Sequence, residues 1–561
     1  MNFSRRALVG IVLGLTLLIP STFPVQAAAI AVNTTHMTVA DDGKCSLVEA
    51  IIAAETDTSS GVKPGECPAG NGADTILLQQ ATYTLTEVYD DAFIPLGLPM
   101  ITSDVTIEGG HAVIQRANNA PEFSLLAVWK NTSKLTMKDV TLRGGRTSGD
   151  AVGPALLLAT DATATLTNVQ ILENISHHTG ASWTIDASVY VSDATLIMID
   201  SVIADNTGEH ANGMLAYGST ITLNNTTISG HTEKGIIVNN TTLALWESSL
   251  TGNGKQGLTA EESDIQIMRS GIYSNQDGGV DLYASTMTMD ESRIQRNIVS
   301  EGNGNLAGGM AIRSGSIVTL TNTTISGNDD YEDPPPCPCV IGNDAVAVRD
   351  SSLSVSNSLI EDDGDDDNRD TTLDFDGGDL RLFNSTVSGS GPYQIRLGGA
   401  KLVAIVFSTI ASDFDYSFGP TAFNNSGTAA RITISNSIVQ GCWRSVGNGS
   451  HGYNIEPTTT CGFKSTGDKQ NVPFDTLWTP LQDNGGPTKT HALSADSEAI
   501  DMIPANVNDC KPGESVDQRG ALRAGGAGKG GLKCDCGAYE AASNVRGPAT
   551  PTLFLPLYWR K

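Results

Sequence analysis

Hydrophobic residues in the middle of the chain recur in a fixed pattern, with apolar residues at positions i, i+2 and i+7 and asparagine at i+10. In the stretch TTLALWESSLTGN these positions are Leu243, Leu245, Leu250 and Asn253. The pattern returns after 22 residues and again after 22 more, and it also occurs 22 residues earlier with histidine in place of asparagine. These three units consist of Ile265, Ile267, Ile272 and Asn275; of Met287, Met289, Ile294 and Asn297; and of Ile221, Leu223, Ile228 and His231. A strict period over four units identifies an internal repeat.

The pattern extends in both directions, with insertions. About a dozen units lie between residues 105 and 440, at spacings from 22 to about 35 residues. The further units are Leu135, Met137 and Leu142; Leu196, Met198, Ile203 and Asn206; Val318, Leu320, Ile325 and Asn328; Leu353, Val355 and Ile360; Leu380, Leu382 and Val387; Val403, Ile405 and Ile410; and Ile432, Ile434 and Val439.

The spacing within one unit predicts two short strands. Alternation at i and i+2 indicates a strand with one buried face, and the i+7 residue begins a second strand after a bend. One unit is too small to bury its own apolar face, so units must stack. A leucine-rich repeat would need a different leucine spacing and a helical segment, and a propeller about twice the period. The sequence therefore predicts an all-β parallel β-helix, a rod of roughly 60 Å at about 4.8 Å per coil.

The asparagine at i+10 falls where the chain must turn. Asparagine tolerates left-handed backbone and bonds neighbouring backbone groups, and stacked asparagines would form a ladder. Ligand binding by this row is the alternative. The threonine pairs in NNTTISG and TNTTISG are interpreted as exposed strand and turn positions.

Composition narrows the possible partners. Charged residues make up 17% of the chain and the formal net charge is -28. Nucleic-acid binding needs clustered lysine and arginine, so this charge argues against a nucleic-acid partner. It suits a soluble surface protein or one that meets cations.

The N-terminus has the three parts of a secretory signal peptide. Arg5 and Arg6 precede an apolar stretch from Ala7 to Ile19, and small residues follow at Ala27 to Ala29. The alternative is a retained membrane anchor, but the apolar stretch is short for a span. We therefore expect residues 1–29 to be removed and the mature chain, which has no other segment apolar enough to cross a membrane, to be exported.

The nine cysteines predict disulfides in an exported chain. An odd number leaves at least one thiol free or paired between chains. The CPC motif of Cys337 and Cys339 has one intervening residue, which disfavours zinc. The local pairs are Cys45 with Cys67, Cys442 with Cys461, and Cys510 with either Cys534 or Cys536.

Three stretches near the chain ends carry a family resemblance. DDGKCSLVEAIIAAE, residues 41–55, resembles the CSLREA motif of exported bacterial β-helix proteins, with Val48 in the place of arginine. Residues 434–463 resemble the last coil and cysteine-bounded loop of these proteins. LQDNGGPTKTHALSADSEAIDM, DQRGALR and CDCGAYE resemble the choice-of-anchor Q region, with Cys536 replacing the usual apolar residue. The resemblance implies a right-handed β-helix, export and association with the cell surface, and it implies no reaction.

These observations divide the chain into five expected parts. They are a signal peptide at 1–29, a CSLREA-type cap with the first coils at 30–104, β-helix repeats at 105–440, a disulfide-bearing choice-of-anchor Q-like region at 441–545, and an apolar tail at 546–561. The tail is too short to span a bilayer, which leaves a sorting tag or a docked terminal strand.

The sequence contains no recognisable set of catalytic residues. His231 follows Gly230, but Thr232 stands where a polygalacturonase-like Gly-His-Gly signature has its second glycine. His210 has no matched acid pair in the neighbouring coil. A lone histidine on a coil is more often a turn residue than a base.

Other side chains suggest ligands. The acidic run at 361–379 contains Asp374, Asp376 and Asp379, candidate Ca²⁺ ligands near two glycines, although the closing glutamate of an EF-hand is missing. The alternative is a solvated acidic insertion, and no other cofactor is expected. Trp183, Trp246 and Tyr283 fall in or near coils, but the sequence shows no repeated row of aromatics.

The sequence thus predicts an exported cell-surface or extracellular β-helix protein with a structural or adhesive role. Its expected partner is the cell envelope or an extracellular polysaccharide or protein surface. The alternative is a carbohydrate-active β-helix enzyme, a polysaccharide lyase or a glycoside hydrolase. The two separate on whether acids and a base converge in a groove on adjacent coils.

Overall fold

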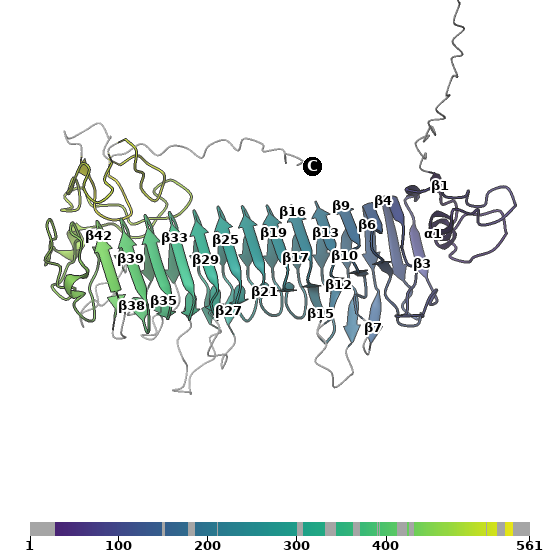
Figure 1. The fold of residues 1–561 in the computed structure, drawn as a ribbon, viewed down its shortest axis with the longest axis horizontal. Coiled ribbons are helices and arrows are strands. Elements are labelled where there is room, and N and C mark those ends of the chain that lie inside the picture. Colours follow the sequence, from purple (N-terminus) through teal and green to yellow (C-terminus); the bar gives the residue numbers. More distant parts are fainter. Residues whose placement is uncertain are drawn as a thin grey trace, which may run out of the picture.

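The chain is wound into stacked coils that form a rod (Figure 1). The computed structural model describes residues 28–148, 152–177, 186–209, 211–299, 307–330, 344–362, 371–389, 391, 393–411, 423–425, 431–511, 513–523 and 533–541. Each coil contributes one strand to each of three faces, here called A, B and C. Faces A and B belong to one 27-stranded sheet, because β4 and β6 run from one face into the other, and face C is a 12-stranded sheet.

All strand pairs along the three faces are parallel, as predicted. Face A consists of β1 (Ala29–Ala31), β2 (Asp74–Leu77), β4 (Asp104–Arg116), β6 (Lys134–Arg143), β9 (Thr163–Thr167), β13 (Thr195–Ile199), β16 (Thr220–Asn224), β19 (Thr242–Trp246), β22 (Asp264–Met268), β25 (Thr286–Asp290), β29 (Ile317–Thr321), β33 (Ser352–Ser356), β36 (Asp379–Phe383), β39 (Leu402–Val406) and β42 (Arg431–Ser435).

Face B holds the second, shorter strands. Besides the ends of β4 and β6 it consists of β3 (Thr82–Leu85), β10 (Gln170–Leu172), β14 (Val202–Ala204), β17 (Thr227–Ser229), β20 (Ser249–Thr251), β23 (Gly271–Tyr273), β26 (Arg293–Gln295), β30 (Thr324–Ser326), β34 (Leu359–Asp362), β37 (Thr386–Gly389), β40 (Thr409–Ala411) and β43 (Ile438–Val439).

Face C closes each coil. It consists of β5 (Leu126–Trp129), β8 (Leu156–Ala159), β12 (Asp186–Ser192), β15 (Ala211–Tyr217), β18 (Ile236–Asn239), β21 (Leu258–Glu261), β24 (Val280–Tyr283), β28 (Met310–Arg313), β32 (Val346–Arg349), β35 (Thr371–Asp376), β38 (Tyr393–Leu397) and β41 (Phe423–Asn424). Smaller pairs are β7 (Arg146–Ser148) with β11 (Ile175–His177), β27 (Ile298–Val299) with β31 (Asp329–Asp330), and β44 (Ile503–Pro504) with β45 (Lys533–Cys534).

The predicted apolar positions form the core. Leu243 pairs in register with Ile265, and Ile265 with Met287, so equivalent side chains of successive coils stack inside the rod. These three side chains are fully buried, and among all the predicted i, i+2 and i+7 residues only Ile432, near the last coils, is partly exposed.

The predicted asparagine ladder is present at the corner between faces B and C. The Asn253 backbone N–H and its Nδ2 both donate to Asn275 Oδ1, at 3.1 and 2.8 Å, and Asn275 bonds Asn297 in the same way. The expected left-handed conformation, however, belongs to the residue before each asparagine, such as Gly252 and Ser274. The asparagine side chain itself points into the rod. There its amide bonds backbone groups that have no backbone partner at the corner.

The other two corners carry ladders of serine and threonine that the sequence interpretation missed. Between faces A and B, the Thr226 N–H donates to Ser248 Oγ at 3.1 Å and the Ser248 N–H to Ser270 Oγ at 3.0 Å. Between faces C and A, Thr241 and Ser263 are bonded likewise. Thr226 and its counterpart Thr323 were expected to be exposed, and they are buried because they belong to these ladders.

The N-terminal end of the rod is covered by α1 (Leu47–Thr56), which lies beside β1 in Figure 1. Ser46 caps the helix: its Oγ accepts from the Glu49 N–H, and the Glu49 carboxylate accepts from the Ser46 N–H. Leu47 and Ile51 are fully buried in the same cluster as the coil interior. The predicted disulfide between Cys45 and Cys67 ties the start of this segment to the loop that follows it.

The described residues between 441 and 541 form few regular elements, among them the 3-10 turns η1 (Gly447–Gly449) and η2 (Phe474–Thr476). Cys442, Cys461 and Phe463 of the first part are buried in the core of the coils, and the rest packs against the last coils (Figure 1). The predicted disulfide Cys442–Cys461 is present, and Cys510 pairs with Cys534. Cys536 is a buried free thiol that donates to the Tyr453 carbonyl. Cys337 and Cys339 lie outside the described residues.

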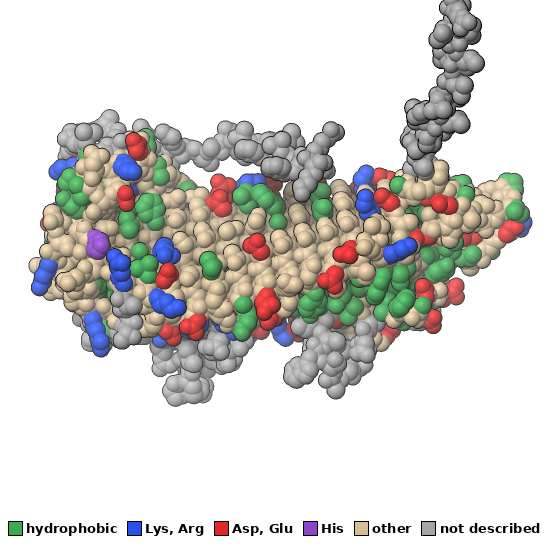
Figure 2. Space-filling model, viewed as in Figure 1, with side chains coloured by type: hydrophobic (Ala, Val, Ile, Leu, Met, Phe, Trp, Pro, Cys, Tyr) green, Lys and Arg blue, Asp and Glu red, His purple; other side chains and the backbone are tan. Residues whose placement is uncertain are grey.

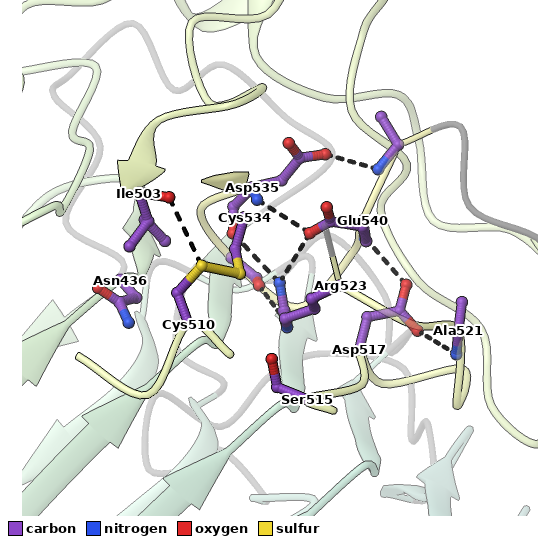
Figure 3. Close-up of polar contacts among 12 residues, drawn as sticks. Asn436, Ile503, Cys510, Ser515, Asp517, Ala521, Arg523, Cys534, Asp535 and Glu540 are labelled. Carbon is purple, nitrogen blue, oxygen red and sulfur yellow. Dashed lines mark hydrogen bonds and ion pairs between the residues drawn. A yellow bond between two sulfur atoms is a disulfide. The ribbon is translucent and has the colours of Figure 1, made fainter. Parts of the chain in front are cut away.

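A buried arginine, Arg523, bonds this region to the rod. Figure 3 shows it beside Asp535 and Glu540. Arg523 donates to the Gly537 carbonyl at 2.8 Å and to Asn384 Oδ1 at 3.0 Å, and its guanidinium lies 4.1 Å from the ring centre of Phe407. Asn384 and Phe407 belong to coils, whereas Gly537 belongs to CDCGAYE. The DQRGALR and CDCGAYE segments thus meet at Arg523.

No helix in the described part of the chain is long and apolar enough to cross a membrane.

Candidate functional site

Face C presents two rows of outward side chains, since alternate residues of each strand point away from the core. We call them the inner row and the outer row. The inner row contains Ala127, Leu157, Tyr190, Leu215, Ile237, Thr259, Asp281, Ala311, Ala347, Asp374, Arg396 and Asn424. The outer row contains Trp129, Ala159, Ser192, Tyr217, Asn239, Glu261, Tyr283, Arg313, Arg349 and Asp376.

Three aromatic residues recur in the outer row at equal intervals. Trp129, Tyr217 and Tyr283 are each three coils apart, which corresponds to about 14 Å at the usual spacing of strands. Phe93 stacks on Trp129 with ring centres 5.8 Å apart, and Tyr190 lies 6.1 Å from Tyr217. The sequence interpretation, which found no such row, was wrong here.

The two ends of face C differ in chemistry. Towards the N-terminus the rows are mainly apolar, and Leu157 clusters with Trp129 and Tyr190. Figure 2 shows hydrophobic side chains gathered over the first coils. Charge enters the outer row with Glu261 of β21, and from β24 onwards both rows carry charges.

The charged half is organised around two aspartates of the inner row. Arg313 Nη2 donates to Asp281 Oδ2 at 2.6 Å. Asp374 receives two arginines, Arg349 Nη2 on Oδ2 at 2.5 Å and Arg396 Nε on Oδ1 at 2.8 Å. The Asp374 side chain is 5% exposed while that of Arg396 is 46% exposed, so the arginines form the outer surface of the cluster.

A second carboxyl, that of Asp344, lies close enough to Asp374 and its arginines to feel their charges. Asp344 precedes β32 and is 8% exposed. Burial, followed by the negative charge of Asp374, raises the pKa of Asp344 well above its ordinary value, although Arg396 and Arg349 oppose the shift. The hydrogen bond to Asp374 raises the pKa of Arg396. The cluster therefore contains one carboxyl, that of Asp344, whose surroundings favour the protonated form.

Unpaired polar atoms lie beside this cluster. Within the described residues, Thr259 Oγ1, Arg313 Nε, Gln256 Oε1 and Asp277 Oδ1 are buried and have no hydrogen-bond partner. Burial also lowers the pKa of nearby Lys234, against the attraction of Asp281. Buried groups left without partners are uncommon and mark places where a ligand can supply the missing bonds.

The three aspartates predicted as Ca²⁺ ligands lie in different surroundings. Asp374 bonds arginines, Asp379 pairs with Arg381 at 3.2 Å, and Asp376 lies at the exposed end of β35. No group of three potential metal ligands occurs among the described residues, so these carboxylates do not converge there, and calcium binding stays a prediction.

His231 and His210 have separate outcomes. His231 is a ladder residue, 2% exposed, and burial lowers its pKa to about 4. His210 and Trp183 lie outside the described residues. Sequence reasoning missed the face C rows because the insertions between coils vary in length, which hides the equivalence of Trp129, Tyr217 and Tyr283.

The comparisons with known proteins agree with this fold. Residues 126–302 match the family described as the right handed beta helix region. Among solved structures, the chain is similar to the A-module of the mannuronan C-5 epimerase AlgE4 of Azotobacter vinelandii, with 16% identity, 65% of this chain and 96% of that chain covered, and a TM-score of 0.38. For the A-module of AlgE6 of the same organism the values are 11%, 62%, 92% and 0.27.

The periplasmic alginate epimerase AlgG is similar at 12% identity over 56% of this chain and 76% of its own, with a TM-score of 0.28. No curated protein matches the sequence. These likenesses concern the fold alone. Stacked parallel coils and the matched region together define the protein as a right-handed parallel β-helix.

Proposed function

We propose that this protein is an exported surface rod that binds an extended polysaccharide along face C. The observation that carries the proposal is the outer row, in which Trp129, Tyr217 and Tyr283 recur every three coils. Sugar rings present apolar C–H faces that pack on aromatic rings. Because a polysaccharide repeats regularly, its rings can make the same contact with each aromatic residue of the row. The three disulfides and the signal-peptide-like N-terminus support an oxidising location outside the cytoplasm.

The polar half of face C gives the glycan its orientation. Thr259 Oγ1 and Arg313 Nε lack partners, so hydroxyl groups of a bound sugar complete their hydrogen bonds. Tyr283, which is 47% exposed, belongs to β24, the coil between those of Thr259 and Arg313. An aromatic platform with polar groups next to it is the usual composition of a small-molecule or sugar site.

The affinity of the rod for polysaccharides tests the proposal. We expect Tyr283→Ala to weaken binding of the preferred member of a panel of polygalacturonate, alginate, xylan and dextran by about tenfold, the loss typical of a truncated interface aromatic. Tyr89→Ala is the matched control, because Tyr89 is 42% exposed and lies outside the rows. Failure of the parent protein to bind any glycan, or equal losses in both variants, would contradict the proposal.

A second candidate function is carbohydrate cleavage or epimerisation on the same face. The observation that favours it is the buried carboxyl of Asp344 close to Asp374, since its raised pKa suits a general acid, which must hold a proton before it donates it. Asp344→Asn removes the proton donor with little change in shape. If the protein is an enzyme, this variant binds the glycan normally but produces no new reducing ends or unsaturated products.

A further inference from the structure

A pocket with three arginines opens at the corner between faces B and C in the first coils, away from the charged half of face C. Its volume is about 820 Å³, within the range of ligand pockets. Its wall contains Thr84, Gln115, Arg116, Ala117, Asn118, Arg143, Gly144, Arg146, Glu173, Ile175, Asp205 and Thr207. Its wall holds three arginines and two carboxylates, and a third carboxylate, that of Glu122, pairs with Arg146, so the arginine charges are partly balanced in a chain whose net charge is -28.

The arginines come from successive coils and are held in different ways. Arg116 ends β4, and its Nε and Nη2 donate to the carbonyls of Pro121 and Ala120, at 2.7 and 2.6 Å. Arg143 ends β6 and places Nε and Nη2 on one oxygen of Glu173. The carbonyl contacts hold Arg116, which lines the pocket, without neutralising its charge.

Arg146 completes the set. Its Nε donates to Glu122 Oε1 at 2.7 Å, and among the described residues no group accepts from its two Nη atoms. Burial lowers the pKa of Arg116, and the charge of Arg146 lowers it further. Two cations that repel each other across a pocket are costly in the free protein, and an anion between them relieves the repulsion.

We propose that this pocket binds an anionic group, a carboxylate or a sulfate, of an acidic polysaccharide. Guanidinium groups bind both oxyanions through two parallel hydrogen bonds, and the unoccupied Nη atoms of Arg146 provide such a pair. Gln115, Asn118 and Thr207 supply neutral donors and acceptors for the sugar hydroxyls around the anion. The inference deepens the proposed function and rests on it, since it specifies the charge of the bound glycan.

The test uses paired ligands that differ only in charge. Binding of a polygalacturonate hexasaccharide is compared with that of its fully methyl-esterified form, and dextran sulfate with dextran, by calorimetry at low salt. We expect the parent protein to bind at least one charged form about tenfold more tightly than its neutral counterpart. The pair that shows the difference identifies the anion as carboxylate or sulfate.

Variants then assign the effect to the pocket. The double variant Arg143→Gln and Arg146→Gln should bring the affinity for the charged form down to that of the neutral form. Arg269→Gln is the matched control. Arg269 is similarly exposed and donates at 3.0 Å to Glu247 of the preceding coil, and it does not line the pocket. Folding of all variants is compared by circular dichroism and thermal unfolding.

The outcomes separate the two proposals. Equal binding of charged and neutral forms overturns the anionic pocket and supports the glycan-binding function. A charge preference that persists in the double variant overturns the assignment to these arginines. If only the charged forms bind and the double variant abolishes that binding while Tyr283→Ala does not weaken it, the pocket stands and the role of face C is overturned.

Discussion

The coils and residues 441–541 differ in how their buried polar groups find hydrogen-bond partners. The coils repeat one solution: at most corners a serine, threonine or asparagine side chain accepts from the backbone of the preceding coil. The described residues between 441 and 541 have no repeat, and Arg523, their largest fully buried side chain, bonds partners from three segments: Val516, Asn384, and the pair Asp535 and Gly537. Repetition distributes the free energy of folding evenly along the rod. The irregular region instead concentrates buried charge around Arg523, beside single bonds to the coils such as that of Ala538 with Thr409.

The largest expected effect follows from this concentration. Arg523→Met removes a charge that is fully buried, and with it the bonds to Asn384 and Gly537 and the ion pair with Glu540. Breaking a buried network of this kind typically costs about 3–5 kcal/mol. We expect residues 441–541 to detach from the coils and become sensitive to protease while the rod stays folded.

Calorimetry and limited proteolysis distinguish this outcome from general destabilisation. The control is Arg381→Met, because Arg381 makes an exposed ion pair with Asp379, its side chain is 52% exposed, and we expect a change within about 0.5 kcal/mol. A single cooperative transition that shifts as a whole in Arg523→Met would show that the two regions unfold together and that the contrast is wrong.

A smaller effect is expected inside the asparagine ladder. Asn275→Ala removes two bonds that Asn253 donates and two that Asn275 donates to Leu250 and Asn297. Because water does not reach the site, the orphaned groups keep part of their desolvation penalty, and we expect a loss of about 3 kcal/mol. Chemical denaturation measures it.

The position of the damage tests the one-dimensional character of the rod. If each coil contacts only its neighbours, hydrogen exchange should accelerate in the coils next to Asn275 and not in those near Asn384. Faster exchange along the whole rod would mean that the coils act as one cooperative unit.

The sequence predicted the interior of the rod well, because the core is a local property of each coil. Leu243 and its counterparts at i+2 and i+7 must be buried in any arrangement that stacks the repeats. The outward rows depend instead on how insertions of different length are absorbed, so the equivalence of Trp129 and Tyr217 appears only in the register of face C. The asparagine was correctly placed at a corner, but its inward orientation depends on the left-handed residue before it.

The smallest effect at neutral pH concerns an irregular position of the ladder, His231. His231 stands between Asn206 and Asn253, its Nε2 is buried without a partner, and its pKa is lowered to about 4 by burial. The unfolded chain binds a proton at this histidine near pH 6.5, whereas the folded protein does so only near pH 4. Stability contributed by neutral His231 is therefore present above pH 6.5 and is lost as the pH falls towards 4, with a loss of about 2 kcal/mol at pH 5.

His231→Asn should remove this loss. We expect the variant to unfold with nearly the same free energy as the parent at pH 7, within about 1 kcal/mol, and to be the more stable of the two at pH 5. His451→Asn is the control, since His451 is exposed and should leave the pH dependence unchanged. The stability of the parent and of His231→Asn could instead fall equally steeply between pH 7 and pH 5. In that case other groups control acid unfolding, and the rod tolerates a histidine in its ladder as readily as an asparagine.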